Sequence, residues 1–82
     1  MDIVTRSKIS GTCEGFKKDR VFELFGGTKW RQIADKDKAF QTKNALMQIW
    51  ESNGRNYLEI VGVGQTVEVQ RLTWLNLKLP TL

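Results

Sequence analysis

The sequence predicts an all-β fold, a small barrel or strongly bent sheet of about five to six antiparallel strands. Apolar and polar residues alternate with a period of two along most of the chain. Turn signals that contain glycine separate these alternating segments, as in hairpins. No segment shows a persuasive apolar repeat of roughly 3.6 residues, so no helix is expected.

The first half of the chain is expected to begin with a strand over residues 7–13. A strand in VFELF follows, in which Phe22 and Leu24 share one face. The adjacent glycines of GGTK predict a turn, because a phosphate-binding loop needs G-x-x-x-x-G-K-[ST] before a helix. A strand in TKWRQI comes next, and the polar residues 34–44 are expected to form a loop or one irregular turn.

The second half of the chain predicts three more strands, each with one buried face. The buried pairs are Met47 and Ile49, Leu58 and Ile60, and Val67 and Val69. Asn53-Gly54 is a strong hairpin signal between the first two strands, and residues 62–65 are expected to connect the second to the third. Trp50 is expected on the face opposite Met47, near Tyr57 across the hairpin.

Length and composition indicate one small globular domain. The chain has 82 residues, and we expect a domain over 1–72 and a tail strand over 73–82. Thirteen basic and nine acidic residues are mixed along the chain, which favours a solvated surface over a clustered nucleic-acid footprint. No membrane span or secretory signal is visible, and the single Cys13 fits a cytoplasmic location.

The chain contains no histidine, which argues against most catalytic chemistry. A Ser-His-Asp or Cys-His pair is impossible within the chain, and one cysteine without histidine excludes a structural zinc site. Cys13 is expected to be a small buried hydrophobe. We therefore expect no catalytic residues, no metal and no cofactor, and we predict that the protein is not an enzyme.

The running pattern resembles a group of small uncharacterised bacterial domains. The shared motifs are a G-x-x-x-G-W/F opening, a V-F-x-L-x-x-G hairpin, a W-x-Q strand and a closing V-x-V-x-R-L. In this sequence they fall on Ile9, Gly11, Gly15, Phe16, Val21, Phe22, Leu24, Gly27, Trp30, Gln32, Met47, Ile49, Gly54, Leu58, Ile60, Gly62, Val67, Val69, Arg71 and Leu72.

This resemblance implies a compact Src-homology-3-like β-barrel and no established activity. Similar short proteins occur on mobile gene cassettes of the integron type, which implies an accessory role in bacteria. Two features depart from the pattern: Phe16 stands where Trp is commoner, and residues 34–44 are rich in lysine and aspartate where tyrosines are expected.

The candidate binding surface contains aromatic and polar residues on two predicted strands. Trp30 is either the wall of a ligand groove, with Gln32 as a polar contact, or a structural residue that covers the barrel mouth with its indole N–H bonded to backbone. We favour the structural alternative. An exposed Trp50–Tyr57 pair near arginines either binds a base or partner or only stabilises its hairpin. The full candidate set is Trp30, Arg31, Gln32, Trp50, Arg55 and Tyr57.

The tail predicts a contact between copies of the chain. Leu75, Leu77 and Leu79 alternate with polar residues after Trp74, and Pro80 ends the pattern. A small barrel has little spare surface to cover these side chains. We therefore expect a homodimer formed through the tail strand.

Two hypotheses for function follow. The first is a non-catalytic interaction module that binds a protein or small ligand and forms a homo-oligomer. The alternative is a small barrel that binds single-stranded nucleic acid through Trp50, Tyr57 and nearby arginines. An enzyme whose site forms only at an oligomer interface has no supporting motif.

Overall fold

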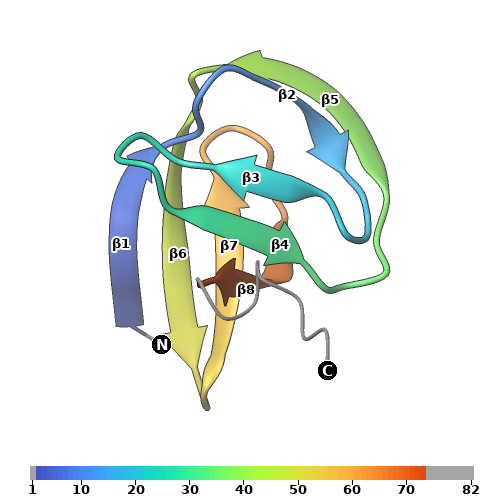
Figure 1. Ribbon diagram of the computed structural model, residues 1–82. Helices are drawn as coiled ribbons and strands as arrows, with labels where there is room; N and C mark the ends of the chain where they lie inside the picture. The colour runs from blue at the N-terminus through green and yellow to red at the C-terminus, as the bar shows by residue number, and fades with distance from the viewer. Residues whose placement is uncertain (1, 74–82) are drawn as a thin grey trace, which may run out of the picture.

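The computed structural model describes residues 2–73, and these form an all-β fold with no helix in that range (Figure 1). The class predicted from the sequence is confirmed. The described residues form eight strands rather than five to six: β1 (Asp2–Lys8), β2 (Thr12–Phe16), β3 (Val21–Glu23), β4 (Lys29–Gln32), β5 (Lys38–Lys43), β6 (Leu46–Ser52), β7 (Arg55–Ile60) and β8 (Thr66–Leu72).

Six of these strands form one antiparallel sheet in the order β1-β6-β7-β8-β4-β3, and β2 pairs with β5 in a separate ribbon. The larger sheet is strongly curved, so β3 and β4 cross over β6 and β7 (Figure 1). Its two edges meet beyond the ends of β1 and β3. There Ser10 N donates to Glu23 O at 2.7 Å, Phe25 N donates to Lys8 O at 2.9 Å, and Ile9 forms an isolated bridge with Leu24.

The core fills the space inside this curved sheet and beneath the β2–β5 ribbon. The alternation predicted for the strands decides which residues enter it: Met47, Ile49, Leu58, Ile60, Val67 and Val69 are all buried, as expected. Phe16 of β2 joins them and contacts Phe22 and Phe40 edge to face, at ring-centroid distances of 6.3 and 5.0 Å. Cys13 is buried, as predicted.

Two turns confirm the hairpin predictions. Asn53 and Gly54 both have positive φ, 54° and 79°, and they join β6 to β7 as a type I′ turn requires. The Gly26-Gly27 pair lies in the β3–β4 hairpin, where Gly27 N donates to Leu24 O at 2.9 Å. A strand rather than a helix follows this turn, so it is not a phosphate-binding loop.

Two predictions about the elements are wrong. The strand expected over residues 7–13 is broken between β1 and β2, where Gly11 has a φ of 81°. The loop expected over 34–44 contains β5, which lacks an apolar alternation and is held mainly by pairing with β2. Gly15 permits that pairing, because a Cβ there would collide with the Lys38 carbonyl.

Candidate binding surfaces

Two of the residues predicted to bind a ligand, Trp30 and Gln32, lie inside the protein. Both are on the concave side of β4 and are buried, so neither is available to a partner at the surface. The Trp30 indole N–H has no hydrogen-bond partner among the described residues, so the expected bond to backbone is wrong. Such an unpaired buried donor costs about 1–3 kcal/mol of stability.

Gln32 instead holds two loops together. Its side-chain oxygen accepts from Lys17 N at 2.8 Å, on the loop between β2 and β3. Its amide nitrogen donates to Ala34 O at 2.9 Å and to Lys36 O at 2.8 Å, on the loop between β4 and β5. A fully buried amide with three partners is a structural residue, and its position identifies no ligand site.

The other candidate residues lie on the convex side of the large sheet. Trp50 and Tyr57 are direct cross-strand partners on β6 and β7, and both are half-buried, as the hairpin predicted. Arg55 is on the same face of β7, and Arg31 lies on the same face of β4. We call Trp50, Tyr57, Arg55 and Arg31 the aromatic face.

Polar contacts already occupy the aromatic face. The Trp50 indole N–H and the Gln48 amide both donate to Glu59 Oε1, each at 2.8 Å. The bond from Gln48, followed by the bond from Trp50, lowers the pKa of Glu59 below its ordinary value of 4.5, and burial opposes them. The Glu59 carboxylate is therefore ionised at neutral pH and holds the indole in place.

Both arginines of the aromatic face have acidic partners. Arg55 Nε lies 3.9 Å from Glu68 Oε2, and Arg31 Nη1 lies 4.0 Å from Asp19 Oδ1. These pairs are weak because they are exposed, yet the carboxylates cancel much of the positive charge that a phosphate backbone needs.

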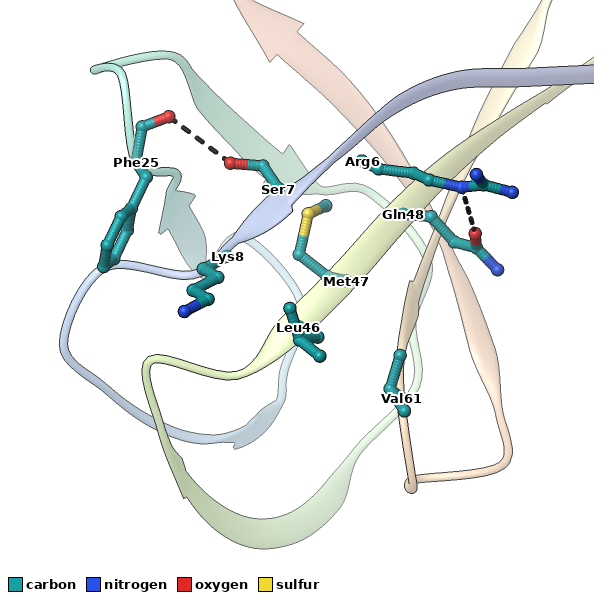
Figure 2. A pocket seen from close by; sticks show the side chains of 8 residues that line it. All are labelled: Arg6, Ser7, Lys8, Phe25, Leu46, Met47, Gln48 and Val61. Atoms are coloured by element: carbon teal, nitrogen blue, oxygen red, sulfur yellow. Dashed lines mark hydrogen bonds between the residues drawn. The ribbon is translucent and has the colours of Figure 1, made fainter.

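A second surface, which the sequence did not reveal, is an apolar hollow of about 520 Å³ at one end of β1 and β6 (Figure 2). Three large apolar side chains lie around it although they are half exposed: Phe25 at 50%, Leu46 at 55% and Val61 at 61%. Its other lining residues are Arg6, Ser7, Lys8, Met47 and Gln48. We call this site the basic hollow.

Four separate chain segments build the basic hollow. Leu46, the first residue of β6, pairs with Lys8, the last residue of β1. Val61 follows β7, and its amide donates to Leu46 O at 3.0 Å. Phe25 follows β3 and reaches the hollow because its amide bonds to Lys8 O. Neighbouring strands therefore bring Lys8, Leu46 and Val61 together, and the meeting of the two sheet edges adds Phe25.

The three half-exposed apolar residues of the basic hollow stand where the alternation of their strands faces solvent. Phe25 follows the buried Leu24, Leu46 precedes the buried Met47, and Val61 follows the buried Ile60. An apolar residue at a position where the alternation calls for a polar one is the sequence signal that identifies them.

The charge at the basic hollow is positive. Lys8 Nζ lies 6.0 Å from the centre of the Phe25 ring, and Arg6 Nε donates to Gln48 Oε1 at 3.3 Å. Within residues 2–73, no carboxylate lines the hollow and neither Arg6 nor Lys8 forms an ion pair. This distinguishes these two cations from the paired arginines of the aromatic face.

Within the described part of the chain, no three His, Cys, Asp or Glu side chains gather in a way that would hold a metal ion. The same residues include no helix able to cross a membrane. The predicted tail residues Trp74, Leu75, Leu77 and Leu79 lie outside the described residues.

Comparisons with known proteins assign no relative to the chain. No protein-family model matches it, and no curated protein or solved structure matches it significantly. The resemblance to small bacterial domains stays a prediction from the sequence.

Proposed function

We propose that this protein is a non-catalytic binding module that engages its partner through the basic hollow. The supporting observation is that Phe25, Leu46 and Val61, all half exposed, surround one hollow. Scattered exposed apolar residues are ordinary, but a contiguous group around a concavity is typical of a binding site. Arg6 and Lys8 on its rim, which form no ion pair with the residues that the structure describes, add polar contacts that orient a partner.

An apolar reporter dye tests this proposal. Anilinonaphthalene sulfonate should bind the native protein saturably, with a rise in fluorescence. The Leu46→Ser/Val61→Ser variant should bind it about fivefold or more weakly, because two apolar contacts are lost. Val21→Ser is the matched control, since Val21 is also exposed but does not line the hollow. Absence of binding, or an equal loss in the control, would contradict the proposal.

The finer architecture that we propose is a Src-homology-3-like barrel in a cytoplasmic bacterial protein of accessory role. The hydrogen bonds between the ends of β1 and β3 support near-closure of the large sheet. An experimental structure with a continuous ladder between these edges would support the barrel form, and solvent separating the edges would oppose it.

Self-association through the tail belongs to the same proposal. Its support is the alternation of Leu75, Leu77 and Leu79 in the sequence. Removal of residues 73–82 should halve the mass measured by analytical ultracentrifugation. An unchanged mass would contradict a dimer formed by the tail.

Binding of single-stranded nucleic acid is the second candidate function. The observation in its favour is that Trp50 and Tyr57 are paired side by side, with Arg55 on the same face. A mixed-sequence oligonucleotide should then quench tryptophan fluorescence saturably and more weakly as salt rises. No quenching at low salt would exclude this function.

A further inference from the structure

We infer that the basic hollow binds a peptide segment of another protein in which apolar side chains are adjacent to carboxylates. This inference rests on the proposed function. The apolar part of this inference follows from Phe25, Leu46 and Val61, which remain half exposed. A shallow site of this kind covers only one side of its occupant. It therefore suits side chains that project from a polypeptide better than a small molecule that must be enclosed.

The positive charge of Arg6 and Lys8 favours a partner peptide that carries carboxylates. Lys8 pairs with Leu46 and Arg6 pairs with Gln48, so both cations project on the same side of the sheet as the apolar residues. Glu59, an acidic residue on this face, already accepts hydrogen bonds from Gln48 and Trp50. A carboxylate on the partner would therefore find two cations that no described acidic residue neutralises.

The peptide is expected to dock by its side chains and not as an added strand. β1 is an edge strand, but its register shifts between Ile3 and Thr5, and such bulges obstruct pairing with another strand. At the other end of β1, the Phe25 amide already donates a hydrogen bond to Lys8 O. The backbone of β1 is thus poorly suited to pair with an added strand, whereas the side chains of the basic hollow remain exposed to a partner.

The chain's own tail fits the hollow less well than an acidic segment does. Residues 74–82 contain Lys78 and no acidic residue. Binding of the tail would bring a third cation beside Arg6 and Lys8, which is unfavourable at short range. The same argument disfavours the tail of a second copy.

Two matched probe peptides test the inference. Both are short and amphipathic, with leucine and phenylalanine on one side; one carries glutamate at the flanking positions and the other carries lysine there. The glutamate probe should bind about tenfold more tightly, because two surface charge pairs change sign between the probes. The Arg6→Gln/Lys8→Gln variant should remove this preference.

The control is Arg31→Gln/Arg55→Gln, which removes the same net charge from the aromatic face. This variant should retain the preference for the glutamate probe. Equal binding of both probes to the native protein, or an equal loss in the control, would overturn the inference and leave the proposed function standing. If neither probe binds, or if Leu46→Ser/Val61→Ser does not weaken binding, the proposed function fails with it.

Discussion

The aromatic face and the basic hollow both expose aromatic rings and cations on the large sheet, but their surroundings differ. Trp50 donates its indole N–H to Glu59, and Arg31 and Arg55 have acidic partners. Phe25 in the hollow is half exposed, and the cations near it form no ion pair among the described residues. Exposure of an aromatic residue is therefore a weaker indication of a binding site than the absence of internal partners.

Substitution of the buried Gln32 should cause the largest loss in the free energy of unfolding, and it is the reference for substitutions in the two regions. Gln32→Ala should lower the free energy of unfolding by about 3 kcal/mol, because three backbone groups lose a buried partner. Urea denaturation measures this loss. Gln70→Ala, on the exposed side of β8, is the control and should change stability by less than about 0.5 kcal/mol. Similar values for the two variants would contradict the structural role of Gln32.

Trp50→Ala should show that the aromatic face supports the fold. We expect a loss of about 1–2 kcal/mol in the free energy of unfolding, from the bond to Glu59 and the cross-strand contact with Tyr57. Trp50→Phe keeps most of the packing and should lose less. If Trp50→Ala leaves the urea midpoint unchanged, the aromatic face is free to bind, and the contrast between the two regions fails.

The pH dependence of stability should report the bonds to Glu59. Because its pKa is lowered in the folded protein, its contribution is fully present above the ordinary value of 4.5. The contribution is lost as the pH falls from 4.5 through the lower folded pKa. Thermal unfolding at neutral and acidic pH should therefore show a smaller decline in Tm for Glu59→Gln than for the native protein. An identical decline would indicate that these bonds do not favour the ionised form.

Substitutions in the basic hollow should have the smallest effect on stability. Phe25→Ser and Leu46→Ser should each change the free energy of unfolding by less than about 0.5 kcal/mol in either direction, since both side chains are half exposed. Urea denaturation at equal pH and salt is the measurement. A loss above about 1 kcal/mol would mean that the hollow is part of the core and not a binding surface.

The parts of the fold that could be predicted are those where one face of a strand is buried. Alternation placed Leu58, Ile60, Val67 and Val69 in the core because each strand has one solvated side. β5 was not predicted because it is stabilised mainly by pairing with β2, which is distant in the sequence. The bounds of β1 were not predicted for a similar reason, since β1 pairs with β6, which is also distant in the sequence.

The candidate site was predictable only in part. The Asn53-Gly54 turn sets the register that brings Trp50 opposite Tyr57, so this cross-strand pair could be predicted from the local sequence. The sequence offered Gln32 as a polar contact of a ligand groove, whereas its actual partners are backbone groups of two loops, which local sequence does not reveal. The basic hollow depends on the pairing of β1 with β6 and on the approach of the two sheet edges, contacts between segments distant in the sequence that no local pattern contains.

The most direct test of the contrast between the two regions is an amide correlation (HSQC) spectrum recorded while the glutamate probe is added. We predict that the signals of Phe25, Leu46 and Val61 move saturably, while those of Tyr57 and Arg55 stay in place. Movement confined to the aromatic face would contradict the assignment of binding to the basic hollow.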